Sequence, residues 1–144
     1  MRGHREALEA GRYEEASHSP VYYVQYAHAR IASILRKAAD TGLTPASSIV
    51  GALGPDDGPE ARLMRAIVRL PEVVEDAVLA EETQGITAYA TELATEFHAF
   101  YRDARVVDAE APERSAIRLA VARAAQVTLA NTLGLLGISA PESM

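Results

Sequence analysis

Tyrosine and basic side chains recur at helical spacing near the start of the chain. Tyr23, Tyr26, Arg30 and Lys37 follow one another at intervals that place them along one side of an α-helix. Aromatic rings stack on unpaired bases and cationic groups hold phosphates, so the combination is typical of a surface for single-stranded nucleic acid. A structural interpretation also stays open, because tyrosines at the rim of a core expose only their hydroxyls while Arg30 forms an ion pair.

The helix that must position these residues begins after Ser19, a good N-cap, with Pro20 in its first turn, and runs to about Ala39. On a helical wheel its core face is a separate apolar set, about 100° from the aromatic and basic side. That set is Val24, Ala27, Ile31, Ile34, Leu35 and Ala38. His28 lies near the core face and is interpreted as a packed, hydrogen-bonded histidine.

Further helices are expected downstream, separated by connectors rich in Gly and Pro. Their approximate ranges are 44–53, 60–70, 71–82, 84–105 and 113–136, with Gly137 as the C-cap of the last. The helix at 84–105 carries one apolar stripe, formed by Ile86, Ala90, Leu93, Phe97, Phe100 and Ala104. No segment alternates with period 2, so we predict an all-α helical bundle of five to six helices. Residues 1–18 are expected to form a polar N-terminal arm, and 19–144 the bundle.

Composition excludes several classes of site. The 144 residues contain no cysteine, which rules out disulfides, cysteine-ligated zinc and thiol catalysis. No His, Asp or Glu set has ligand spacing, and no phosphate-binding glycine loop occurs, so we expect no metal, no cofactor and no catalytic residues. No apolar run reaches the roughly 20 residues of a membrane span, so no membrane partner is expected.

Charge is uneven along the chain, whose formal net charge is -6. This balance argues against general DNA binding, because phosphate affinity comes mainly from Lys and Arg. The first helix nevertheless carries Arg30, Arg36 and Lys37 within eight residues. An acidic block lies elsewhere, at Glu72, Glu75, Asp76, Glu81 and Glu82. A local basic face on an acidic protein therefore stays compatible with the aromatic and basic helix.

Four separated segments resemble, in the same order, parts of the anticodon-binding (DALR) domain of arginyl-tRNA synthetases. They are YYVQYAHARI at 22–31, LPEVVE at 70–75, ELA and FHAFY between 92 and 101, and LAN and LGLLGISAPE between 129 and 142. Several motifs in order are more specific than one, and together they cover about residues 19–144. The resemblance implies the DALR helical bundle as the fold.

That family grips the anticodon loop of tRNA(Arg), which becomes the expected partner. By motif, the resemblance implies that Tyr23, Tyr26 and Arg30 face the anticodon bases, that Tyr101 adds an aromatic contact and that Met144 approaches the loop. Three positions depart from the family pattern: Ser19 replaces an Asn, Thr132 a Gly, and Ser143 a basic residue before the final Met. The last change removes a positive charge close to the expected site.

The resemblance leaves the role of the chain open. The catalytic signatures of the family, HIGH-like and KMSKS-like, do not occur in the 144 residues, so this segment is expected neither to bind ATP nor to charge tRNA. Two interpretations stay open. The segment is either an excised domain, which would need a catalytic subunit, or a standalone paralogue. The unfamiliar first 18 residues favour the paralogue. A cytoplasmic location is expected in either case.

Two further functions stay open. A repurposed paralogue would use an enclosed aromatic pocket between the helices at 20–39 and 84–105 for a small-molecule ligand or a protein partner, with enzymatic activity in a specialised pathway. Such a pocket would hold Tyr23, Tyr26, His28 and Tyr101, and its candidate ligand-binding residues are Tyr22, Gln25 and His28. A purely structural interaction domain would instead associate through the alanine-rich helix around residues 116–130.

Overall fold

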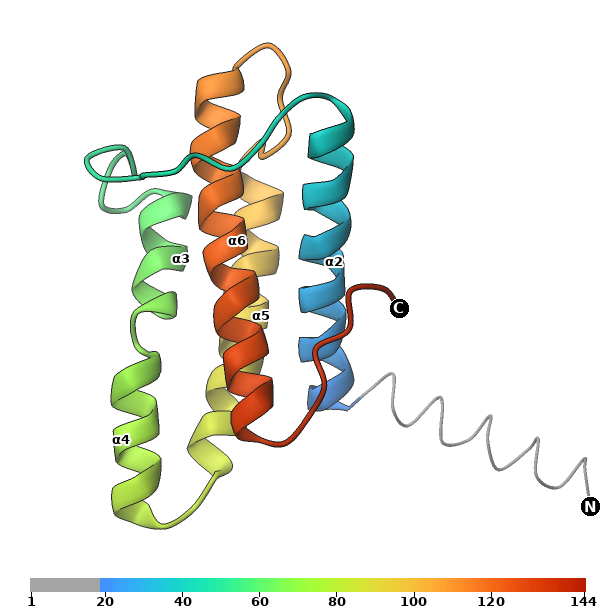
Figure 1. Ribbon diagram of the computed structural model, residues 1–144. Coiled ribbons are helices and arrows are strands. Elements are labelled where there is room, and N and C mark those ends of the chain that lie inside the picture. Colours follow the sequence, from blue (N-terminus) through green and yellow to red (C-terminus); the bar gives the residue numbers. More distant parts are fainter. Residues whose placement is uncertain (1–18) are drawn as a thin grey trace, which may run out of the picture.

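The structure, a computed structural model, describes residues 19–144, and every regular element within that range is a helix (Figure 1). The five helices are α2 (Pro20–Asp40), α3 (Pro59–Ile67), α4 (Leu70–Ala80), α5 (Gln84–Asp103) and α6 (Pro112–Leu135). The predicted all-α class is confirmed, with the helix count at the lower end of the predicted range. The arm predicted for residues 1–18 lies outside the described residues.

Local signals set the start of α2 and the end of α6. The Ser19 hydroxyl accepts a hydrogen bond from the backbone N–H of Tyr22 at 3.0 Å, and Pro20 follows it, as predicted. Gly137 has a φ of 72°, a left-handed conformation that directs the chain out of α6, and the N–H of Ile138 bonds back to the helix. The last residues then return along α2 (Figure 1).

The segment between α2 and α3 corrects one prediction, because no helix forms over residues 44–53. Gly51 and Gly54 have left-handed backbone conformations, with φ of 73° and 79°, which end any helical run there. Part of this loop bonds to a distant helix instead, since the N–H of Ala46 donates to the carbonyl of Ala116 on α6 at 2.8 Å. Such tertiary hydrogen bonds compete with helical ones, and a local propensity argument cannot anticipate them.

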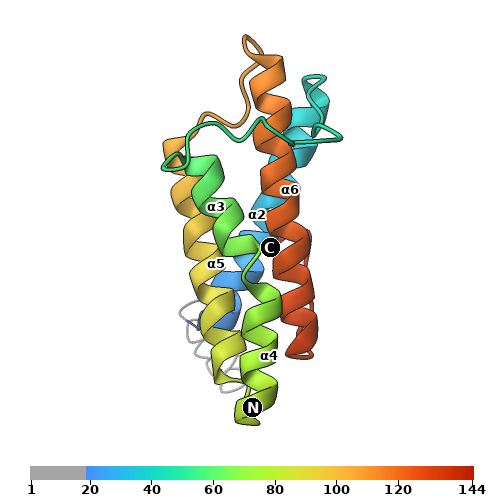
Figure 2. The ribbon, with the colours of Figure 1, turned by 90° about the vertical axis from the view of Figure 1, so that its left-hand side faces the viewer.

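Three long helices form the centre of the bundle, and two shorter ones cover one side of it. Helices α2, α5 and α6 pack against one another, while α3 contacts both α5 and α6. Helix α4 continues from the end of α3 and packs chiefly on α5 (Figures 1 and 2). None of its side chains is fully buried. It is therefore a peripheral element, and α2 lies on the far side of the bundle from it (Figure 1).

The apolar stripes predicted for α2 and α5 form a large part of the core. All six residues of the stripe predicted for 84–105 are buried, the last of them directly after α5, as are Val24, Ala27, Ile31, Ile34 and Ala38 of α2. Leu35 is half-buried at the edge of the core. Helix α6 completes the core with Leu119, Val121, Ala122, Ala125, Leu129 and Leu133. This packing fixes the rotation of α2, and with it the direction of every polar residue on that helix.

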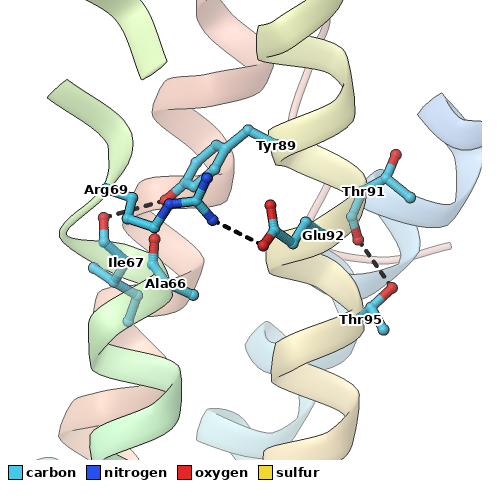
Figure 3. Close-up of polar contacts among 7 residues, drawn as sticks. All are labelled: Ala66, Ile67, Arg69, Tyr89, Thr91, Glu92 and Thr95. Carbon is cyan, nitrogen blue, oxygen red and sulfur yellow. Dashed lines mark hydrogen bonds and ion pairs between the residues drawn. The ribbon is translucent and has the colours of Figure 1, made fainter. Parts of the chain in front are cut away.

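Tyr89 ties α5 to the end of α3 (Figure 3). Its ring is buried, and its hydroxyl donates to the carbonyl of Ala66 at 2.6 Å, with the carbonyl of Ile67 at 3.2 Å. The Arg69 guanidinium lies 5.9 Å from the ring centroid and pairs with Glu92 at 2.8 Å. Burial raises the pKa of Tyr89 to about 12, against a smaller lowering by the charge of Arg69.

A buried ion pair joins α3 to α6. Glu60, in the first turn of α3, is only 4% exposed, and its carboxylate accepts a hydrogen bond from Arg118 Nε at 2.8 Å. The same guanidinium donates through Nη1 to the carbonyl of Arg105 at 2.8 Å. One arginine thus connects α3, α6 and the turn that follows α5.

Replacing Tyr89 by Phe should lower the free energy of unfolding by about 1–2 kcal/mol, because the carbonyls at the end of α3 lose their donor while the ring still packs. The folded pKa of Tyr89 lies above its ordinary value of 10.0, so its contribution is intact below pH 10.0 and is lost as the pH rises toward about 12. Denaturant unfolding at several alkaline pH values measures both effects. Equal loss of stability by wild type and Tyr89→Phe over that interval would contradict the assignment.

Replacing Arg118 by Ala should destabilise the fold by about 3 kcal/mol, because it leaves the buried Glu60 carboxylate without a partner. The double variant Glu60→Gln with Arg118→Ala should recover part of this loss, since a neutral amide tolerates burial better. Arg62→Ala is the matched control, because that arginine is exposed and bonds only to a loop carbonyl. Urea denaturation should show a loss within about 0.5 kcal/mol for the control. An Arg118→Ala variant as stable as the control would refute the role of the pair.

Candidate nucleic-acid interface

The two candidate tyrosines of α2 occupy different environments. Tyr23 is half-buried, and its hydroxyl lies 3.1 Å from Thr95 Oγ1 on α5. Because the Thr95 hydroxyl donates to the carbonyl of Thr91 at 3.0 Å (Figure 3), Tyr23 is the donor in its own contact. Tyr26 is 44% exposed. Tyr23 therefore matches the rim interpretation, whereas Tyr26 presents a ring to solvent.

His98 on α5 lies at the centre of this aromatic group. It could not be predicted as a member of the site from the sequence, because it lies between two faces of its helix. Its ring centroid is 5.4 Å from that of Tyr23 and 6.1 Å from that of Tyr26. Arg30 Nη1 lies 2.8 Å from His98 Nδ1. A guanidinium only donates, so Nδ1 accepts and the proton of the neutral ring is on Nε2. Burial lowers the pKa of His98, and the charge of Arg30 lowers it further.

Arg30 is held from two directions. Besides its hydrogen bond to His98, its guanidinium carbon lies 4.6 Å from the ring centroid of Tyr101. Tyr101 in turn stacks beside Phe97, with ring centroids 6.1 Å apart. Tyr101 is thus placed as a support beneath Arg30. An arginine held in this way keeps further N–H groups for a ligand at a reduced cost in side-chain entropy.

Three side chains of α2 hold the C-terminal tail by its backbone carbonyls. Gln25 Nε2 donates to the carbonyl of Ser139 at 3.0 Å, and Arg36 Nη1 donates to that of Glu142 at 3.3 Å. His28 is 6% exposed, and its Nδ1 lies 2.7 Å from the carbonyl of Pro141, to which it donates. The expectation of a packed, hydrogen-bonded His28 is confirmed. The proposed pocket residues Gln25 and His28 therefore contact the tail.

A hollow of about 330 Å³ opens between α2 and this tail, and we call it the α2–tail hollow. Its lining is Tyr26, Ala29, Arg30, Ser33, Arg36, Lys37, Glu142, Ser143 and Met144. Four of the six predicted RNA-binding residues meet here: Tyr26, Arg30, Lys37 and Met144. Tyr101, which lies under Arg30, and Tyr23, which lies beside His98, are not part of this lining. Tyr22 is not part of it either. Arg36 is an additional cation, signalled in the sequence only by its place in the basic cluster.

Most arginines in residues 19–144 are engaged away from this hollow. Four pair with carboxylates, namely Arg69, Arg102, Arg105 and Arg118. Three bond to loop carbonyls, namely Arg62, Arg65 and Arg114. By contrast, the cations of the α2–tail hollow have no carboxylate partner among the described residues. They remain able to neutralise a bound anion.

The described residues also limit other chemistry. Within residues 19–144, no three His, Cys, Asp or Glu side chains come together in a way that could hold a metal ion. None of the helices in that range is long and apolar enough to cross a membrane. The arrangement is thus suited to binding an anionic ligand that carries exposed aromatic rings. Tyr26 can stack on a ring, and the cations can attract the negative charge.

Comparisons with a family model and with known proteins agree on one family. The model of the DALR anticodon binding domain family matches residues 24–144. The arginine–tRNA ligase of Symbiobacterium thermophilum is 47% identical over 131 residues, or 90% of this chain and 23% of that protein. That of Geobacillus thermodenitrificans is 41% identical over 130 residues, again 90% of this chain and 23% of that protein. The chain thus spans about a quarter of the length of these relatives.

The fold agrees as well. The structure of Thermus thermophilus arginyl-tRNA synthetase superposes with a TM-score of 0.69 and 34% sequence identity, covering 85% of this chain and 21% of that one. The family match extends over most of the chain and includes α2 from Val24 onward, the tail and every helix between them. This chain belongs to the DALR anticodon binding domain family.

Proposed function

We propose that this chain binds the anticodon loop of tRNA(Arg) in the α2–tail hollow. The observation that carries the proposal is the exposed ring of Tyr26 beside three cations that lack carboxylate partners within residues 19–144. Membership of an anticodon-binding family supports an RNA ligand. The choice of tRNA(Arg) rests on the relatives, which are arginine–tRNA ligases.

Each part of the hollow has a role in this proposal. Tyr26 stacks on an unpaired anticodon base, a contact worth roughly 1–3 kcal/mol. Arg30, held by His98 and Tyr101, directs its free N–H groups to a base edge or a phosphate. Lys37 contributes a point charge to the RNA backbone. Met144, 56% exposed at the end of the tail, packs against a splayed base.

The position of the acidic residues supports this assignment. The block that gives the chain its negative balance lies on α4 and the turn after it, at Glu72, Glu75, Asp76, Glu81 and Glu82. Helix α4 and α2 lie on opposite sides of the bundle (Figure 1). Repulsion of RNA is therefore concentrated away from the hollow, and the acidic surface disfavours indiscriminate binding of DNA.

The alternative of an enclosed small-molecule pocket has less support. It called for a pocket between α2 and α5 lined by Tyr23, Tyr26, His28 and Tyr101. Among these, only Tyr26 lines the α2–tail hollow, which opens to solvent between α2 and the tail.

We propose that aminoacylation belongs to a catalytic domain, within the same protein or on a separate subunit, and that both act in the cytoplasm.

Substitutions of Tyr26 and Arg30 test the proposal. Tyr26→Ala should weaken binding of a tRNA(Arg) anticodon stem-loop by about 5- to 100-fold, whereas Tyr26→Phe keeps the stacking ring and should lose little. Arg30→Lys should weaken binding nearly as much as Arg30→Ala, because an ammonium group cannot reproduce the contacts with His98 and Tyr101. Fluorescence anisotropy with labelled stem-loop at several salt concentrations measures these affinities.

Two controls accompany these measurements. Arg65→Ala removes the same charge on α3, outside the hollow, and should leave affinity nearly unchanged. A stem-loop with an unrelated anticodon should bind more weakly. Equal affinity for both stem-loops would refute the assignment to tRNA(Arg). Absence of any binding at low salt would refute RNA binding by this chain.

The neutral state of His98 has its own test. NMR of the folded protein should show the Nε2–H tautomer at neutral pH and a pKa below 6.5. The pKa of His98 is lower in the folded protein than in the unfolded chain, so the unfolded chain takes up the proton more readily. The stability that neutral His98 contributes is therefore present above pH 6.5 and is lost as the pH falls through the pKa of the folded protein. Arg30→Met should raise the pKa of His98. A pKa unchanged in that variant would contradict the Arg30–His98 contact.

A further inference from the structure

A second hollow of about 300 Å³ adjoins the first, between α2, α6 and the tail. We call it the α2–α6 hollow. Its lining is Ala32, Leu35, Arg36, Pro45, Arg123, Gln126 and Glu142. Arg36 and Glu142 line both hollows, so the two meet at this point of the tail.

We propose that the α2–α6 hollow binds a backbone phosphate of the same RNA whose unpaired bases occupy the α2–tail hollow. The inference rests on the proposed function and adds to it a second contact, made by Arg123 and Gln126 of α6. The RNA would then pass over the tail at Glu142 and touch two helices. None of the sequence motifs pointed to Arg123.

The donors of the α2–α6 hollow are available. Arg123 is exposed and has no hydrogen bond or ion pair with any residue in 19–144. Arg36 uses Nη1 for the carbonyl of Glu142, which leaves other N–H groups of its guanidinium. Gln126 is half-buried on the same helix as Arg123 and adds an amide donor. Two guanidinium groups and an amide provide the planar N–H donors that bind phosphate oxygens well.

Arg36 connects the two sites. It lines both hollows, so one guanidinium can lie between neighbouring groups of a single RNA strand. Arg30, Arg36, Lys37 and Arg123 together form a track of cations without carboxylate partners among the described residues. On a chain with net charge -6, such a track selects a polyanion that follows it.

Glu142 opposes this ligand. It is exposed, and among the described residues it is the only one with a carboxylate side chain in the lining of either hollow. Its carboxylate would repel a phosphate, whereas its backbone carbonyl holds the tail through Arg36. The side chain therefore acts against binding without being needed for the fold of the tail. This gives the site a substitution expected to strengthen affinity.

Binding of the anticodon stem-loop by matched variants tests the site. Arg123→Ala should weaken affinity about three- to tenfold and reduce the salt slope by about 1, because one phosphate contact is lost. Glu142→Gln should strengthen affinity about two- to fivefold, because it removes a like charge beside the phosphate. The charge-matched controls are Arg62→Ala on α3 and Glu75→Gln on α4, both outside the two hollows.

A stem-loop series with single methylphosphonate substitutions locates the contact. One neutralised phosphate should weaken binding to wild type clearly more than binding to Arg123→Ala, which keeps only the donors of Arg36 and Gln126. If Arg123→Ala and Glu142→Gln behave like their controls, or every methylphosphonate affects both proteins equally, the site is refuted. Loss of affinity in Tyr26→Ala would then leave the proposed function standing. If wild type binds no stem-loop at all, the proposed function and this site both fail.

Discussion

Burial of one face of α2 between α5 and α6 is the constraint on which the rest of the structure depends. Val24, Ala27 and Ile31 leave water only in one rotation of the helix, so the direction of every polar residue of α2 is fixed. One rim brings Arg30 to α5, where aromatic rings and a histidine hold it. The other rim brings His28 to the tail. Both rims therefore follow from a single packing requirement.

The same packing of helices separates the acidic residues from the cations that lack a carboxylate partner. Arginines elsewhere in the described residues pair with carboxylates or bond to loop carbonyls, whereas the cations of α2 and Arg123 remain without a carboxylate partner. The acidic block lies on α4 and the turn after it, and α4 is across the bundle from α2 (Figure 1). Net charge alone would have argued against a polyanionic ligand. The distribution of charge instead favours one direction of approach, which is how an acidic protein can orient an RNA strand.

Elements with a strong local signal were predicted well. The cap and proline at Ser19 and Pro20 set the start of α2, and apolar periodicity identified the core faces of α2 and α5. The loop at 44–53 was predicted wrongly as a helix, because its backbone is shaped by left-handed glycines and a hydrogen bond to α6. His98 was missed for a related reason, since its contact with Arg30 joins residues 68 positions apart.

The sequence by itself determined the all-α class, the family and the helix that carries Tyr26, Arg30 and Lys37. Periodicity contains this information because it records which side of a helix must leave water. The tertiary structure decided which of these residues meet, and it brought Met144 to them while placing Tyr23 apart from the hollow. Such a choice depends on how distant helices pack and where a tail docks, and neither leaves a periodic trace along the chain.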